Sequence, residues 1–183
     1  FHIRKVEAEK DNTHFFDLNE ENFNNTVYAI VEELKQPTNY LKTGLQSLNK
    51  TLMGGFEAGR CYVFLGLTGG FKSGILINIA RWIKENNSHL QPKDSSKKLC
   101  VLYITQENSM KETIERLFNA SVSGDDIRDY TPEEVAALMR NSGLNMDNGI
   151  NLRIKYYPNK SINTDDLYTI IDEIEDEGEE VIA

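Results

Sequence analysis

The stretch that most constrains this chain is CYVFLGLTGGFKSGILINIARWI, which occupies residues 61–83. Residues 61–65 are mostly apolar and have the composition of a buried strand. A loop with three glycines follows, and Lys72 and Ser73 then lead into a segment with the apolar spacing of a helix, residues 73–85. A strand, a glycine-rich loop, a Lys-Ser pair and a helix in this order predict a phosphate-binding loop.

A loop of this kind binds phosphate because of its residue types. Its backbone amides turn inward, and the following helix presents its positive N-terminal end. Its lysine reaches the terminal phosphates and its hydroxyl helps to hold magnesium, so we expect Mg²⁺ beside Ser73. The expected nucleotide-binding residues are Gly66, Thr68, Gly69, Gly70, Phe71, Lys72, Ser73 and Gly74. The alternative is a glycine-rich turn whose lysine is only solvated.

Phe71 departs from the pattern, because a glycine is expected immediately before the lysine. A side chain at a position of positive φ costs about 1–2 kcal/mol. Gly69 and Gly70 offer a way to make the tight turn one residue earlier. We therefore expect Phe71 to keep an ordinary backbone conformation and to affect the reaction rate more than binding.

Strands and helices alternate along the rest of the chain, which predicts an α/β fold with a mostly parallel sheet. Further strands are expected at residues 99–104 and 152–157, with the start of another at 181–183. Further helices are expected at 45–52, 110–120, 131–140 and 164–178, with Thr131 as an N-cap and Pro132 in the first turn. The residues expected to face inward are Ile114, Leu117, Phe118, Leu167, Ile170, Ile171 and Ile174.

The N-terminal part of the chain has a separate pattern. Residues 17–35 predict one amphipathic helix, with Asp17 and Glu20 as a capping box and Pro37 as a stop signal. Its apolar face consists of Phe23, Val27, Ile30, Val31 and Leu34. We therefore expect an arm and helix over residues 1–40 and the main domain over 41–183.

Bulk composition limits the possible partners. A formal charge of −9 excludes a broadly basic surface, so any nucleic-acid contact must be local. No apolar run approaches 18 residues, so no membrane span is expected. Cys61 and Cys100 each begin an apolar run, and we expect both to be small buried residues in a reducing, cytoplasmic compartment.

Three longer segments resemble DnaB-type replicative DNA helicases. The lead-in TGLQSLNKTLMGGFEAGRCYVFLG is similar to the segment that precedes the nucleotide loop in that family. The segment LCVLYITQENSMKETIERL resembles the second strand, which ends in a glutamate and enters a helix. The segment LRIKYYPNKSINTDDLYTII looks most like the phage-encoded branch. The resemblance extends from Thr43 to the end of the chain.

This resemblance implies a RecA-like ATPase core that binds ATP and Mg²⁺. Lys72 would neutralise the β- and γ-phosphates, and Ser73 would ligate magnesium. Glu107 would align and polarise the attacking water, since a carboxylate after a parallel strand faces the same crevice as the loop. The alternative for Glu107 is a solvated acid favoured by a helix dipole.

The family also implies a helicase that couples ATP hydrolysis to movement along single-stranded DNA. It implies a hexameric ring, a possible primase or helicase loader as partner, and a location in a bacterial or phage-infected cell. The helix at 17–35 would be the linker helix that docks on a neighbouring subunit, although it could equally pack on its own domain.

The family's second magnesium-associated Asp would follow Val181, so the chain is expected to be a fragment that is truncated before the second nucleotide-binding motif and hydrolyses ATP slowly. The arginine finger and the DNA-contacting loops would lie further on. Lys93, Lys97 and Lys98 fit a solvated loop better than a DNA track. Two other functions fit the same residues: a recombinase-type or clock-protein-type ATPase, and an assembly module that binds nucleotide without hydrolysing it.

Overall fold

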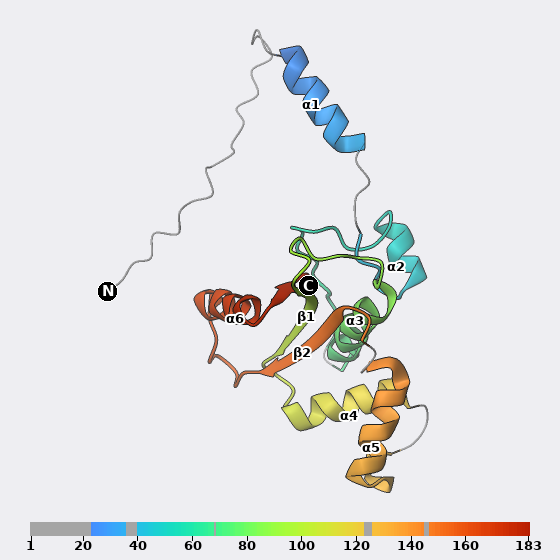
Figure 1. Cartoon of the computed structure of the whole chain (residues 1–183). Coiled ribbons are helices and arrows are strands. Elements are labelled where there is room, and N and C mark those ends of the chain that lie inside the picture. The colour runs from blue at the N-terminus through green and yellow to red at the C-terminus, as the bar shows by residue number, and fades with distance from the viewer. Residues whose placement is uncertain (1–22, 36–39, 68, 123–125, 145–146) are drawn as a thin grey trace, which may run out of the picture. The chain divides into compact units, whose positions relative to one another are not determined.

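The computed structural model describes residues 23–35, 40–67, 69–122, 126–144 and 147–183. It divides the chain into two units, Phe1–Thr38 and Asn39–Ala183. Helix α1 (Phe23–Lys35) belongs to the first unit, and all other helices and strands belong to the second (Figure 1).

The second unit is built on a parallel sheet of three strands in the order β2-β1-β3. The strands are β1 (Lys98–Thr105), β2 (Ile150–Tyr156) and β3 (Glu179–Val181). Cys100 in the central strand lies opposite Asn151 on one side and Val181 on the other. This sheet confirms the predicted α/β class and the predicted strands near 99, 152 and 181.

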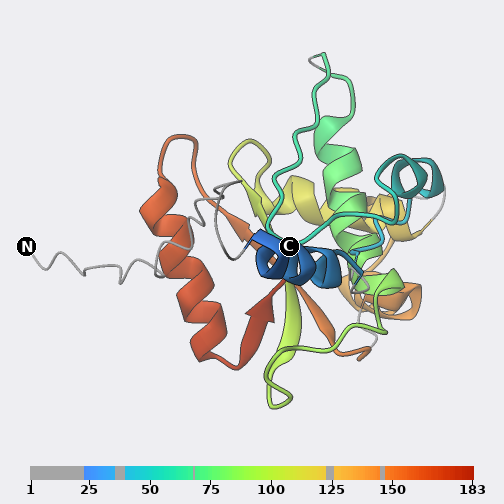
Figure 2. The ribbon, with the colours of Figure 1, turned by 90° about the horizontal axis from the view of Figure 1, so that it is seen from above.

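Helices cover both faces of the sheet (Figure 2). On one face, helix α3 (Lys72–Asn86) buries Ile79, Ala80 and Ile83 against alternate strand residues such as Val101. On the other face, helix α6 (Thr164–Asp176) packs against Cys100. The predicted inward residues Ile170 and Ile174 are buried there, whereas Leu167 is 36% exposed. The prediction for Leu167 was wrong, because helix α6 packs on the strands through a narrower stripe than its apolar composition indicates.

The remaining helices are α2 (Gln46–Thr51), α4 (Met110–Ser121), the 3-10 turn η1 (Ile127–Asp129), α5 (Pro132–Met139) and the π-helical turn η2 (Arg140–Leu144). Of these helices, α2 precedes the strands and the others lie between β1 and β2. Thr131 is the N-cap of α5 and Pro132 lies in its first turn, as predicted. Leu117 and Phe118 of α4 are buried, again as predicted.

Helix α1 confirms the C-terminal part of the amphipathic helix predicted at 17–35. The predicted capping box at Asp17 and Glu20, and the stop signal at Pro37, lie outside the described residues. On α1, Val31 is 40% exposed and Tyr28 is 67% exposed. None of the described helices is both long enough and apolar enough to cross a membrane.

Residues 61–65 do not form the predicted strand. Residues 61–67 have no regular secondary structure, and Val63, Leu65 and Leu67 are exposed. Tyr62 instead stacks on Phe56, with ring centroids 4.4 Å apart. Alternating apolar residues favour a strand, but a strand also needs a hydrogen-bonded neighbour. Within the described sheet, β3 pairs only with β1, and residues 61–65 pair with neither of these strands. The expected burial of Cys61 was wrong for the same reason, since its side chain is exposed while Cys100 is buried.

Candidate functional site

The glycine-rich loop makes a tight turn immediately before α3. The amide of Gly70 donates a hydrogen bond to the carbonyl of Leu67 at 2.9 Å, and Gly69 has a φ of +76°. A Cβ on Gly70 would lie 2.8 Å from the Leu67 carbonyl oxygen, which is too close for any other residue. The sequence requires glycine at both positions because of this turn.

Phe71 does not keep the ordinary conformation that the sequence predicts. Its φ is 59° and its ψ is 22°, so it is left-handed and serves as the N-cap residue of α3. The turn at Gly69 and Gly70 therefore does not relieve Phe71 of a positive φ. The ring of Phe71 lies over Gly74, where an added Cβ would come within 2.4 Å of it. This packing offsets part of the backbone strain and explains why Gly74, which is buried, must be small.

Lys72 is bonded to the loop itself. Its Nζ atom donates to the carbonyl oxygens of Gly66 at 3.0 Å and Leu67 at 2.8 Å. The side chain therefore folds back across the loop instead of extending into solvent. A phosphate group entering the loop would replace two neutral carbonyl acceptors with anionic oxygens, which form stronger hydrogen bonds to an ammonium group.

A cavity of about 370 Å³ joins the loop to the end of strand β1. Its lining consists of Gly69, Gly70, Phe71, Lys72, Ser73, Glu107, Asn108 and Arg116. The structure thus brings Glu107 together with five of the predicted loop residues. Gly66 and Gly74 lie beside the cavity without lining it, and Thr68 is outside the described residues. Larger hollows of about 560, 570 and 730 Å³ lie elsewhere and contain no part of the loop.

Glu107 is held in a short bend between β1 and α4. The hydroxyl of Thr105 accepts a hydrogen bond from the amide of Asn108 at 3.2 Å and donates to the carbonyl of Asn108 at 3.3 Å. Ser109 then caps α4 in a reciprocal box with Glu112. The bend is fixed on both sides, while the Glu107 side chain itself is exposed.

Sequence reasoning missed Asn108 and Arg116. Asn108 is 7% exposed. The only sequence feature that could have indicated its place in the site is that it directly follows Glu107. Arg116 lies three residues after the buried Thr113, so it shares the side of α4 that turns toward the body of the domain. Burial raises the pKa of the Tyr103 phenol, the Arg116 cation opposes this shift and the Glu107 carboxylate adds to it. Both charges therefore act on the same part of the site.

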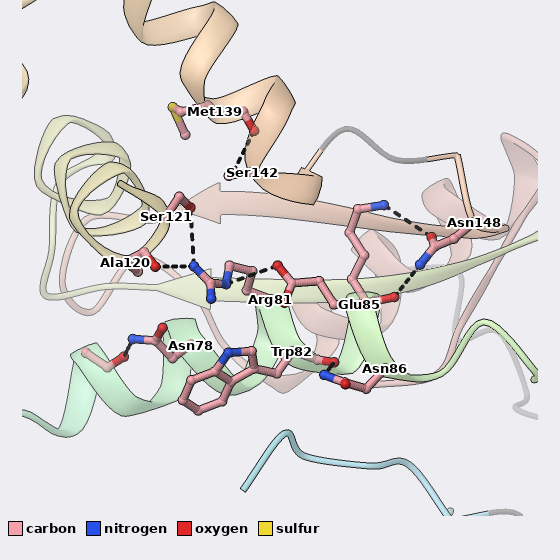
Figure 3. A network of polar contacts seen from close by, with 12 residues as sticks. Asn78, Arg81, Trp82, Glu85, Asn86, Ala120, Ser121, Met139, Ser142 and Asn148 are labelled. Carbon is pink, nitrogen blue, oxygen red and sulfur yellow. Dashed lines mark hydrogen bonds and ion pairs between the residues drawn. The ribbon is translucent and has the colours of Figure 1, made fainter. Parts of the chain in front are cut away.

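A polar network holds α3 against α4 (Figure 3). From α3, the Arg81 guanidinium donates to the carbonyl of Ala120 and, at 3.3 Å, to the hydroxyl of Ser121, both on α4. The same side chain forms an ion pair with Glu85 at 3.2 Å. Burial raises the pKa of Glu85, and the Arg81 charge counteracts that shift. This network fixes the helix that begins at the loop relative to the helix that begins after Glu107.

Replacing Phe71 with Gly is expected to change nucleotide affinity by less than about tenfold, because the phosphate-binding groups of the loop are backbone amides. Glycine relieves the positive φ but also removes the ring that packs on Gly74. Titration with a fluorescent nucleotide measures the effect. Phe71→Ala is the matched control, because it removes the ring and keeps a Cβ at the same φ. A larger loss of affinity in both variants would mean that the ring itself contacts the nucleotide.

Comparison with protein families agrees with this geometry. The model of a family described as "Divergent DnaB-like ATPase" matches residues 2–183. Comparison with curated proteins gives no match. The parallel sheet flanked by helices fits the RecA-like ATPase core that the sequence predicts. Because the family model covers nearly the whole chain, the chain belongs to the divergent DnaB-like ATPase family.

Proposed function

We propose that this chain is part of the motor of an ATP-dependent replicative DNA helicase, of the phage-encoded branch of its family. The observation that carries the proposal is the cavity that Lys72, Ser73 and Glu107 line together. A phosphate-binding loop and a carboxylate that line one cavity are the minimum that hydrolysis of a nucleoside triphosphate requires.

The chain's own residues divide the work as follows. The amides of residues 69–73 and the start of α3 bind phosphate oxygens of ATP. Lys72 leaves the carbonyls of Gly66 and Leu67 and neutralises the β- and γ-phosphates. Glu107, exposed toward the cavity, accepts a hydrogen bond from a water molecule and orients it toward the terminal phosphate.

Magnesium fits this site through one protein ligand. Among the residues that the structure describes, no group of three His, Cys, Asp or Glu side chains is placed to hold a metal ion. The Ser73 hydroxyl lines the cavity at the first turn of α3. Mg²⁺ prefers oxygen ligands and keeps several waters, so Ser73 together with phosphate oxygens would hold it. Bound there, the ion would neutralise charge on the phosphates.

The assembly proposed for the whole protein is a homo-oligomeric ring, hexameric by family resemblance, that encircles single-stranded DNA and works with a primase or a loader. Helix α1 supports this part of the proposal. It belongs to a unit separate from the ATPase unit and carries exposed apolar side chains such as Tyr28 and Val31.

One observation favours a second candidate, an assembly module that binds nucleotide without hydrolysing it. Phe71 takes a strained left-handed conformation at the position where the motif has glycine. A loop fixed in this way can bind phosphates, while its lysine moves too little to stabilise the charge that develops on the terminal phosphate during hydrolysis.

The protein that contains this chain is therefore best tested for ATP-driven strand separation on a forked DNA substrate. The motor proposal predicts unwinding that requires ATP. Strand pairing without unwinding would instead indicate a recombinase-type ATPase. Nucleotide binding without hydrolysis or unwinding would indicate the assembly module.

A further inference from the structure

We propose that Arg116 is a phosphate-binding residue of this site, supplied by the same chain, that distinguishes a nucleoside triphosphate from a diphosphate. The proposal rests on the nucleotide site described above and adds a residue that the phosphate-loop motif does not contain. Arg116 lies on helix α4, and its side chain lines the same cavity as Lys72.

The first observation is that Arg116 forms no hydrogen bond and no ion pair with a described residue, although its charge acts on Glu112 and Tyr103. Four other described arginines form ion pairs with carboxylates: Arg60, Arg81, Arg128 and Arg153. Arg140 donates to the carbonyl of Ala136 at 3.0 Å. Arg116 alone among the described arginines has neither a hydrogen bond nor an ion pair, although the chain carries 29 acidic residues against 20 basic ones.

The acid one turn before Arg116 on the same helix is already engaged. Glu112 stands four residues before Arg116, the usual spacing for a helical ion pair. Its carboxylate instead accepts hydrogen bonds from the amide of Ser109 at 2.7 Å and the hydroxyl of Ser109 at 2.9 Å. The capping box therefore holds Glu112 at the helix start and leaves the Arg116 guanidinium available to the cavity.

The second observation is that the position of Arg116 is fixed. Thr113 and Leu117, on either side of it along the helix, are buried. One turn further on, Ala120 accepts the hydrogen bond from Arg81 of α3 shown in Figure 3. The half-buried Arg116 side chain thus starts from a backbone that is clamped to the helix carrying Lys72.

The charge balance of the cavity gives Arg116 a role. Glu107 brings a negative charge to the cavity that the phosphates of a nucleotide would enter, and Lys72 and Arg116 are the two cations that line it. A guanidinium group binds two phosphate oxygens at once through parallel hydrogen bonds. Because Arg116 comes from the Glu107 side of the cavity and not from the loop, it contacts the phosphate farthest from the loop. A diphosphate lacks that group.

The test compares affinities for ATPγS and ADP in the complete protein and in Arg116→Ala and Arg116→Lys. The expected result for Arg116→Ala is a fall of roughly 10- to 100-fold in ATPγS affinity and less than about threefold for ADP. Lysine keeps the charge and loses the paired hydrogen bonds, so Arg116→Lys should show a smaller loss that is still selective for ATPγS. Arg140→Ala, on the neighbouring turn η2, is the matched control and should change neither affinity.

An equal loss for both nucleotides, or no loss in either Arg116 variant, would overturn the proposal. Should Arg116→Ala fail to fold, Arg116→Lys decides by the same comparison. The underlying nucleotide site is judged separately: if the unmodified protein binds neither ATPγS nor ADP, the site itself is wrong. If it binds both and Arg116 variants bind equally well, only the role of Arg116 is wrong.

Discussion

Lys72→Ala is expected to lower the rate of ATP hydrolysis by roughly 100-fold or more, the scale seen when one preorganised charge-stabilising donor is removed. Lys72 is the only described cation within the glycine-rich loop, and its Nζ atom lies within 3.0 Å of two carbonyls that border the phosphate site. Alanine leaves the loop amides in place but removes the positive charge that stabilises the terminal phosphate during its transfer. Steady-state release of inorganic phosphate by the complete protein measures the change.

The control is Lys50→Ala, which removes an exposed lysine from the last turn of α2 and should leave hydrolysis unchanged. Thermal unfolding of both variants shows whether the fold is intact. The same pair also tests the motor function. If a folded Lys72→Ala protein still separates DNA strands at the normal rate, ATP hydrolysis at this loop does not drive unwinding.

Glu107→Gln is expected to lower the rate constant for hydrolysis by roughly 100- to 1,000-fold, as for loss of a general base. Nucleotide affinity should stay the same or rise slightly, because the carboxylate repels the phosphates and the amide does not. Single-turnover hydrolysis together with equilibrium titration separates these two effects. An unchanged rate together with an unchanged affinity would support the alternative, in which Glu107 is only a solvated acid.

Glu133→Gln makes the matching control, since Glu133 is an exposed acid in the first turn of α5, away from the cavity lining. Like Glu107→Gln, this substitution removes one negative charge by replacing a carboxylate with an amide. Normal hydrolysis in Glu133→Gln and loss of hydrolysis in Glu107→Gln would assign the effect to the position and not to the protein's net charge.

The central part of the fold was predictable because its signals are local. The helix after Lys72 and the strand before Glu107 carry clear apolar patterns, and Thr131 and Pro132 mark a helix start by their own chemistry. The segment 61–65 was not predictable in this way. A strand needs a hydrogen-bonded partner, and the apolar alternation of this segment says nothing about which strand lies beside it.

In the candidate site too, the features with a local sequence pattern were predictable and those that depend on tertiary packing were not. The loop and Glu107 were found from short patterns, and the structure places them around one cavity. The conformation of Phe71 was missed because it depends on the ring packing over Gly74 three residues later. Arg116 was missed because its place in the site depends on how α4 packs on α3. That packing includes a hydrogen bond from Arg81 to Ala120, which lie 39 residues apart in the sequence.

The most direct test of the central claim is an experimental structure of the protein with Mg²⁺ and ADP. The account predicts that the β-phosphate is bound by the backbone amides of residues 69–73 and that the Nζ atom of Lys72 has moved from the carbonyls of Gly66 and Leu67 to the phosphate. A nucleotide bound elsewhere, with Lys72 still hydrogen-bonded to those two carbonyls, would contradict it.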